Sequence, residues 1–220
     1  MKYKINGVIF DFDGVLIDSA ADIINAVQHT RELFGRPVLP ASQIISYVGH
    51  GAEYLIRKSF SDCNEELVIQ ALPLYKKYYL ENALIETTLY PNVETTLQTI
   101  KRETDCKIAL VTNKPENIAK RILAGLNIND YFDLVLGPES VKKMKPDPEG
   151  INKFLSSFGV LAQNAIMVGD SHTDIEAGRN AGTHTCGVTY GLGNRAELIQ
   201  SEPDFYISNM AQLLDHIRTF

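Results

Sequence analysis

The stretch that decides the fold lies near the N-terminus and reads Gly7-Val8-Ile9-Phe10-Asp11-Phe12-Asp13-Gly14-Val15-Leu16-Ile17-Asp18-Ser19. An apolar run leads into two aspartates that are two residues apart, Asp11 and Asp13. Because residues i and i+2 of a strand point to the same side, both carboxylates can meet one ligand where the strand ends. Two like charges at this spacing are costly unless a cation or a shared proton offsets them. The stretch therefore predicts a buried strand that ends at a divalent metal site.

The composition is that of a globular chain. It has 220 residues, of which 45% are hydrophobic and 22% are charged, which is enough apolar material for a core. The net charge of −6 repels a phosphate backbone, so we expect no nucleic-acid partner. Cys63, Cys106 and Cys186 have no metal-site spacing, which predicts reduced thiols in a cytoplasmic protein. No signal-peptide pattern and no bilayer-spanning apolar run is present, so no membrane partner is expected.

Strand and helix patterns alternate over most of the chain. Short apolar runs predict strands at 5–10, 106–111, 133–136, 165–168, 183–188 and 205–207. Helical patterns lie between or after them, at 93–102, 115–124, 148–158, 173–181, 195–199 and 210–217. This alternation predicts an α/β fold with a Rossmann-like doubly wound parallel sheet.

A purely helical block interrupts this alternation after the first strand. Its helical patterns cover 20–33, 41–47, 52–60 and 65–80, and we find no convincing strand between residues 19 and 84. Because the first strand belongs to the sheet by its character, the block is interpreted as an insertion. We therefore predict an α/β core domain of residues 1–16 and 87–220, and an inserted small all-helical domain of residues 17–86.

Polar residues gather where the predicted strands end. In doubly wound sheets, ligands bind at the carboxyl ends of the strands. The residues at these ends are Asp11, Asp13, Thr112, Asn113 and Asp170, and Lys145 lies in the loop before a helix. Hard oxygen ligands suit Mg²⁺, whereas a hydroxyl and a lysine can bind phosphate oxygens. One carboxylate could then attack phosphorus while another protonates the leaving oxygen.

The same residues resemble the four motifs of the haloacid-dehalogenase-like hydrolase superfamily, specifically its phosphoglycolate-phosphatase-like branch. The motifs occur in order and the resemblance covers nearly the whole chain. They are Asp11-Phe12-Asp13-Gly14-Val15-Leu16-Ile17-Asp18-Ser19, Thr112-Asn113, Lys145-Pro146 and Gly169-Asp170-Ser171-x-x-Asp174. Each motif alone is a weak signal, but all four in order on the expected elements are a strong one.

The resemblance implies a role for each motif residue. Asp11 would be the nucleophile and a metal ligand, and Asp13 the general acid/base, which gives its backbone carbonyl to the metal. Lys145 would balance the charge of Asp11 and the phosphoryl group. Phosphoryl binding would fall to Thr112 and Asn113. Asp170 would ligate Mg²⁺, and Asp174 would support the metal from behind.

The helical insert would be a cap that closes over the site and selects the substrate. Its loop Val48-Gly49-His50-Gly51 resembles the phosphatase branch, in which this loop enters the site. We expect Gly49 and His50 to face the substrate, and Arg57 to bind a substrate carboxylate. The stretch 191–193 is expected to line the same opening.

Two further expectations concern residues outside the motifs. We expect three lysines to be solvated, namely Lys114, Lys142 and Lys143. We expect three tyrosines to pack inside the helical block, namely Tyr75, Tyr78 and Tyr79.

The function that these features favour is a Mg²⁺-dependent phosphatase acting on a small phosphorylated metabolite, with 2-phosphoglycolate as the best single substrate. An aspartyl-phosphate on Asp11 would be the intermediate. The presence of Asp13 argues against the dehalogenase and phosphonatase branches, which lack it. A β-phosphoglucomutase-like phosphosugar mutase stays open. A receiver-type phospho-accepting domain is a weaker alternative, because its acceptor lies on a middle strand and it lacks a helical insert. We expect a monomer or a homodimer.

Overall fold

The structure, a computed structural model, describes residues 4–219 and contains one parallel sheet of six strands. The strands are β1 (Gly7–Phe10), β4 (Lys107–Val111), β5 (Leu134–Leu136), β6 (Ala165–Gly169), β7 (His184–Val188) and β8 (Phe205–Ile207), in the order β5-β4-β1-β6-β7-β8. β1 pairs with β4 on one side and with β6 on the other, so that Ile9 lies between Ala109 and Met167. The chain adds strands first on one side of β1 and then on the other. The carboxyl end of β1 is therefore the place where such a sheet binds ligands.

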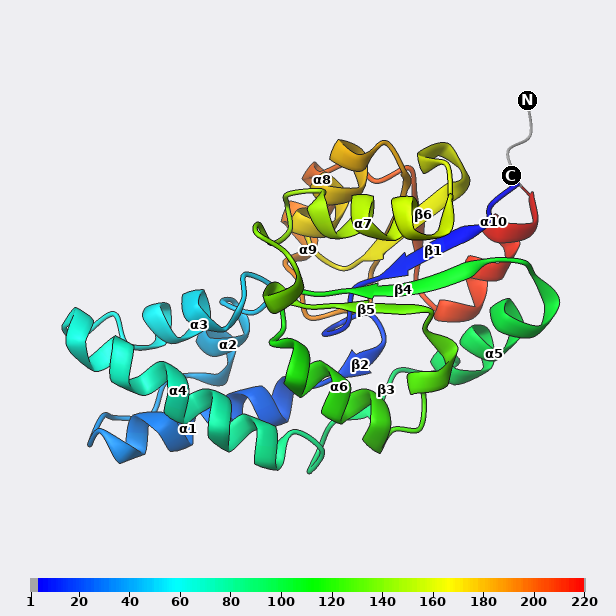
Figure 1. The fold of residues 1–220 in the computed structure, drawn as a ribbon. Helices are drawn as coiled ribbons and strands as arrows, with labels where there is room; N and C mark the ends of the chain where they lie inside the picture. The colour runs from blue at the N-terminus through cyan, green and yellow to red at the C-terminus, as the bar shows by residue number, and fades with distance from the viewer. Residues whose placement is uncertain (1–3, 220) are drawn as a thin grey trace.

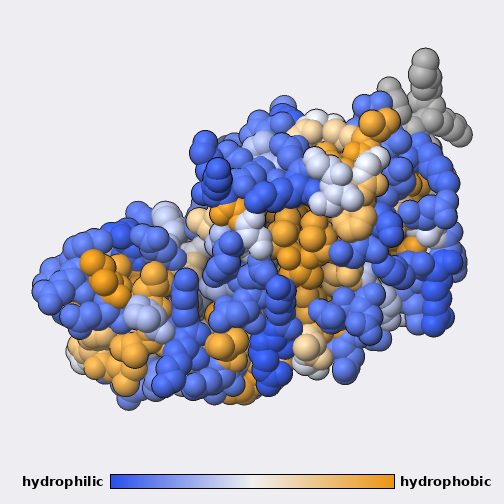
Figure 2. Space-filling view, in the orientation of Figure 1, coloured by the Kyte–Doolittle hydropathy of each residue, from blue (hydrophilic) through white to orange (hydrophobic). Residues whose placement is uncertain are grey.

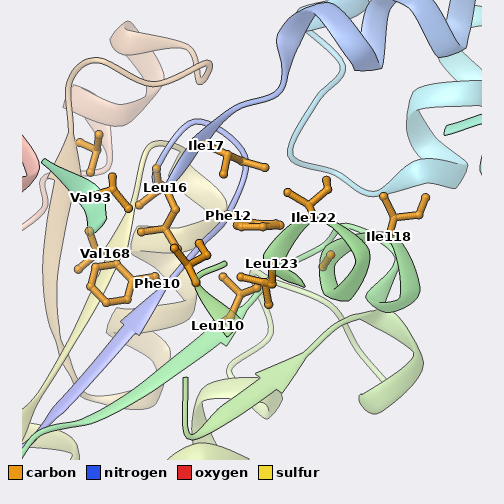
Figure 3. Close-up of a cluster of buried hydrophobic side chains, with 14 of the residues drawn as sticks. Phe10, Phe12, Leu16, Ile17, Val93, Leu110, Ile118, Ile122, Leu123 and Val168 are labelled. Carbon is orange, nitrogen blue, oxygen red and sulfur yellow. The ribbon is translucent and has the colours of Figure 1, made fainter. Parts of the chain in front are cut away.

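Helices cover both faces of this sheet (Figure 1). They are α5 (Val93–Glu103), α6 (Glu116–Gly125), α7 (Glu149–Phe158), α8 (His172–Ala181), α9 (Arg195–Gln200) and α10 (Leu213–Thr219), with short 3-10 turns at Asn129–Tyr131, Pro138–Ser140, Ala162–Asn164 and Met210–Gln212. Phe10 and Leu110 pack against α5 and α6 on one face, as Figure 3 shows. Ile9 packs on the other face against Phe154 of α7. Burial on both faces explains why the strands read as continuous apolar runs. The predicted α/β fold is confirmed.

The inserted block contains the four expected helices, α1 (Ala20–Leu33), α2 (Ala41–Ile45), α3 (Ala52–Ser59) and α4 (Glu65–Asn82). α4 packs against α1 and α3, and the block projects beyond the carboxyl ends of the strands (Figure 1). We call residues 20–82 the helical unit. Its interior includes a fully buried arginine, Arg31, which donates hydrogen bonds to the carbonyl groups of Pro37 and Ser59 and lies beside the ring of Phe60. These bonds offset the cost of burying the charge.

A short antiparallel ribbon joins the helical unit to the sheet, and the sequence did not predict it. Ile17 and Asp18 form β2, which pairs with Thr88 and Leu89 of β3. The two crossings of the chain between sheet and helical unit thus lie side by side. The predicted domain boundaries, 16/17 and 86/87, fall beside this ribbon, and the division into domains stays a prediction.

The buried carboxylate of Asp22 also ties the two crossings together. It accepts hydrogen bonds from the backbone N–H of Thr87 at 2.9 Å and from the Thr87 hydroxyl at 2.7 Å, and from the N–H of Glu86 at 3.1 Å. Asp22 lies in the first turn of α1, where a negative charge is also favourable. Asp22 therefore fixes the start of the helical unit to the segment that follows it.

Within residues 4–219, no helix combines the length and apolarity that crossing a bilayer requires. The three cysteines are free thiols, as expected, and Cys106 and Cys186 are buried.

We predict that Asp22→Ala destabilises the fold by about 2–3 kcal/mol, because it leaves the buried N–H and hydroxyl of Thr87 without a charged acceptor. Urea unfolding followed by circular dichroism measures the change. Glu32→Ala, an exposed site on the same helix, is the control and should unfold with the wild type. Equal stability of Asp22→Ala and the control would show that this carboxylate does not join the crossings.

Candidate active site

Three strands bring the predicted residues to one edge of the sheet. Asp11 follows β1 and continues its pairing with β6, because its N–H donates to the carbonyl of Val168 at 2.9 Å. Thr112 follows β4, and its N–H donates to Leu136 of β5 at 3.0 Å. Asp170 follows β6 directly. The strand-end residues therefore meet, as expected from their sequence positions.

The centre of the site is a group of three buried carboxylates around one lysine. Oxygen atoms of Asp11, Asp170 and Asp174 lie within 4.8 Å of one another. Lys145 Nζ lies 2.8 Å from Asp11 Oδ1 and 2.7 Å from Asp174 Oδ1. The ammonium group thus bridges the proposed nucleophile and the aspartate at the start of α8.

Burial and mutual repulsion shift the pKa values of these groups. Burial raises the pKa of Asp11 to about 6, and the neighbouring Asp174 and Asp13 act in the same direction, against Lys145. Burial, then Asp174 and Asp11, raise the pKa of Asp170 well above its usual range. Burial alone would lower the pKa of Lys145, but Asp11 and Asp174 outweigh it and raise that pKa. The site therefore favours additional positive charge.

Backbone amides form a cradle for Asp170. Its Oδ2 accepts hydrogen bonds from the N–H of Leu192 at 2.7 Å and of Gly193 at 2.8 Å. Gly14 has a φ of +83°, and a Cβ there would lie 1.9 Å from Asp170 Oδ2. A Cβ at Gly191 would lie 2.3 Å from the same oxygen. The stretch 191–193, expected to line the opening, thus orients a carboxylate, and only residues without side chains allow this close approach.

The two oxygens of Asp174 have different partners. Its Oδ2 accepts hydrogen bonds from the N–H and the hydroxyl of Ser171, at 3.1 and 2.6 Å, and so caps α8. Its Oδ1 faces Lys145. The hydrogen bonds with Ser171 fix the carboxylate of Asp174 in place, and its other oxygen then positions Lys145.

The second motif positions the loops that carry other site residues. The Asn113 side chain accepts a hydrogen bond from the N–H of Lys145 at 3.1 Å and donates to the carbonyl groups of Lys145 and Gly49, at 3.0 and 2.9 Å. Thr112 Oγ1 accepts from the N–H of Lys114 at 3.2 Å. Asn113 thus fixes both the lysine loop and the loop of the helical unit, and phosphoryl binding by Thr112 and Asn113 stays a prediction.

Asp13 has partners that the sequence analysis did not find. Its Oδ1 accepts from Ser19 Oγ at 2.5 Å and lies 2.8 Å from Lys114 Nζ. The Lys114 side chain is only 2% exposed and also donates to the hydroxyl of Tyr79. The prediction that Lys114 is solvated was therefore wrong, whereas Lys142 and Lys143 are exposed as expected. Ser19 and Lys114 both bind Oδ1 of Asp13, and the described residues supply no partner for Oδ2.

A small cavity lies between the carboxylates and the helical unit. It measures about 40 Å³ and is lined by residues of the sheet edge and the helical unit, including Asp11, Asp13, Gly49, Leu55, Tyr75, Tyr79, Thr112 and Lys114. Tyr75 and Tyr79 are buried in the helical unit, as expected, and they also form a wall of this cavity.

The structure brings only part of the predicted substrate loop into this cavity. Gly49 lines it, whereas His50 lies beside Tyr54 and His172 on a neighbouring hollow. The side chain of Arg57 is 45% exposed and pairs with two acidic residues of the helical unit, Glu53 and Glu65. Arg57 is not among the residues that line the cavity, and its ion pairs are with these two glutamates and not with the aspartates of the site.

The residues present fit a divalent cation. Four carboxylates, those of Asp11, Asp13, Asp170 and Asp174, face two lysines, Lys114 and Lys145, so the buried site carries an excess of two negative charges when all six groups are ionised. Carboxylate oxygens are the ligands that Mg²⁺ prefers. Asp11 and Asp170 are the candidate ligands of the cation, because both oxygens of Asp174 already have partners, Ser171 and Lys145.

Comparisons with known proteins agree with this arrangement. The family model described as haloacid dehalogenase-like hydrolase matches residues 8–188. Phosphoglycolate phosphatases from Vibrio vulnificus and Aquifex aeolicus are each 36% identical, and the alignments cover 97% and 94% of this chain and 96% and 94% of those proteins.

Solved structures show the same likeness. The crystal structure of a predicted phosphoglycolate phosphatase from Haemophilus somnus superposes with a TM-score of 0.92 at 28% identity and covers 97% of this chain and 98% of its own. A putative phosphoglycolate phosphatase from Lactobacillus delbrueckii, 23% identical, shares the fold with a TM-score of 0.88 and covers 99% of each chain. The chain belongs to the haloacid dehalogenase-like hydrolase family, in the branch that resembles the phosphoglycolate phosphatases.

Proposed function

We propose that this hydrolase is a Mg²⁺-dependent phosphatase that cleaves a small phosphomonoester, with 2-phosphoglycolate as the substrate, through an aspartyl-phosphate on Asp11. The observation that carries the proposal is the position of Asp11, which lines a small cavity together with Asp13 and is backed by Lys145. The proposed nucleophile and the proposed proton carrier thus line one space, and the balancing cation lies against the nucleophile. The names of the relatives that match nearly end to end support the choice of substrate.

The proposed reaction uses the two carboxylates of the first motif in turn. An oxygen of Asp11 forms a bond to phosphorus, and the ester oxygen leaves with a proton from Asp13. The freed Asp13 then takes a proton from water, which attacks the phosphorus and restores Asp11. Lys145 limits the charge that builds up on Asp11 and the phosphoryl oxygens, because it lies 2.8 Å from the nucleophile. A bound Mg²⁺ would offset the charge of the phosphoryl oxygens.

The helical unit has the position of a cap in this proposal. It reaches the site through Gly49, whose carbonyl binds Asn113, and through the tyrosines of the cavity wall. We propose that the domain of residues 17–86, which contains the helical unit, closes over the substrate and is joined to the core through β2 and β3. We also propose a cytoplasmic location, which the three free thiols support. A monomer or a homodimer belongs to the same proposal.

The relatives that match this chain nearly end to end carry the name of a phosphatase, which favours hydrolysis over rearrangement of a phosphosugar. The family match over residues 8–188 favours a hydrolase over a receiver-type domain.

We predict that Asp11→Asn lowers kcat for phosphate release by more than about a thousandfold, because the amide cannot act as the nucleophile. A panel of small phosphate esters and phosphosugars with Mg²⁺, assayed for free phosphate and for isomerised sugar phosphate, gives the measurement. Asp130→Asn, an exposed aspartate, is the matched control and should retain wild-type activity. Wild-type rates in Asp11→Asn would refute the mechanism, and isomerised sugar phosphate without free phosphate would instead support the mutase.

We predict that Gly14→Ala raises the Mg²⁺ concentration needed for half-maximal activity about 10- to 100-fold, because its Cβ would displace Asp170. Activity after chelation and stepwise return of Mg²⁺ provides the measurement. Gly35→Ala is the control, since Gly35 also has a positive φ, +62°, but open space around its missing Cβ. If both variants needed the same Mg²⁺ concentration, Asp170 would not be a ligand.

A further inference from the structure

Lys114 is a buried cation that the motifs of the site do not use. It follows Asn113 at the end of β4, and its side chain is 2% exposed. An ammonium group has three N–H donors. Two of them have partners in the described part of the chain, Asp13 Oδ1 and the Tyr79 hydroxyl. One donor is therefore available to a further acceptor.

The surroundings of Lys114 make it the cation of the substrate cavity. Among the described residues that line this cavity, Lys114 is the one with a positive charge. Arg57, the residue expected to bind a substrate carboxylate, is instead paired with Glu53 and Glu65 at the surface. A second anionic group on the substrate would therefore find its partner in Lys114.

The rest of the cavity does not favour an anion. Ile23, Val48 and Leu55 of the helical unit form an apolar wall, and Asp11 and Asp13 repel negative charge. Lys114 is buried, and burial lowers the pKa of its ammonium group, against the opposing effect of Asp13. Water therefore screens the attraction between this ammonium group and an anion less than it would at the surface.

Tyr79 fixes the position of Lys114 from the helical unit. Its hydroxyl accepts a hydrogen bond from the lysine, and its ring centre lies 4.3 Å from Lys114 Nζ. A cation over an aromatic ring is attracted by the ring face. The ammonium group that would bind the substrate anion thus comes from the sheet edge, and a tyrosine of α4 positions it.

We propose that Lys114 is the specificity-determining residue of this enzyme, and that it binds the carboxylate of a short phosphorylated 2-hydroxy acid whose phosphoryl group faces Asp11. The proposal rests on the proposed function and deepens it. Because Asp11 and Lys114 line the same cavity, we expect a short spacer between the phosphate and the carboxylate. Tyr79 is a positioning residue in this scheme.

The test compares two esters that differ in one group. Ethyl phosphate carries a methyl group where 2-phosphoglycolate carries its carboxylate. We predict that Lys114→Met lowers the ratio of kcat/KM for 2-phosphoglycolate to that for ethyl phosphate by about 10- to 100-fold. The loss specific to 2-phosphoglycolate should appear as a higher KM, because the contact already exists in the bound substrate. Tyr79→Phe should lower the same ratio by a smaller factor.

The ratio separates recognition from a structural role. Loss of the bond to Asp13 in Lys114→Met slows both esters alike and cancels in the ratio. Lys142→Met, an exposed lysine, is the control and should leave both rates unchanged. Equal losses for the two esters, or no preference of the wild type for 2-phosphoglycolate, would overturn the proposal.

A binding experiment distinguishes failure of this proposal from failure of the proposed function. If the wild type released phosphate from neither ester, the phosphatase proposal would fall. Calorimetry then measures the affinity of both esters for Asp11→Asn and for the double variant that also carries Lys114→Met. This comparison tests the role of Lys114 without turnover. A preference for 2-phosphoglycolate that disappears with Lys114→Met supports carboxylate recognition, and unchanged relative affinities refute it.

Discussion

Repulsion among buried carboxylates is the constraint on which the rest of this structure depends. Asp11, Asp170 and Asp174 place oxygens within 4.8 Å of one another, and burial adds to the cost of each charge. Their fixed partners come from three separate segments. Lys145 is delivered by the loop before α7, the amides at 192–193 by the loop after β7, and Ser171 by the start of α8. These segments follow β5, β7 and β6, and because the three strands are parallel in one sheet, their carboxyl ends lie at the same edge.

The helical unit is tied to the same charges. Ser19, which precedes α1, donates to Asp13, and Tyr79 of α4 accepts from the lysine that pairs with Asp13. β2 and β3 keep the two crossings of the chain adjacent. Movement of the helical unit would therefore change the surroundings of Asp13 directly. In the proposed function, substrate selection and proton transfer would share one network, because Asp13 contacts both Ser19 and Lys114.

Much of the fold and part of the site could be predicted from the sequence, because the signals are local. Buried parallel strands are continuous apolar runs, and residues at their ends, such as Asp11 and Asp170, are ordered by the sheet. β2 and β3 were missed because two-residue strands show no periodicity. The amides that bind Asp170 were also missed. A backbone N–H carries no residue-specific signal, and the stretch 191–193 was expected only to line the opening.

Lys114 and Arg57 show why the remaining site residues could not be assigned. Lys114 was expected to be solvated and Arg57 to bind a substrate carboxylate, and in each case the partner decided the outcome. Arg57 has an acid one helical turn away, Glu53, so a surface pair forms locally. Lys114 finds Tyr79, 35 residues distant, only after the helical unit has packed over the sheet edge. The available signal was position, because a lysine directly after a functional strand end is brought to that edge by the sheet. Burial of its charge there requires several partners, and a substrate anion can be one of them.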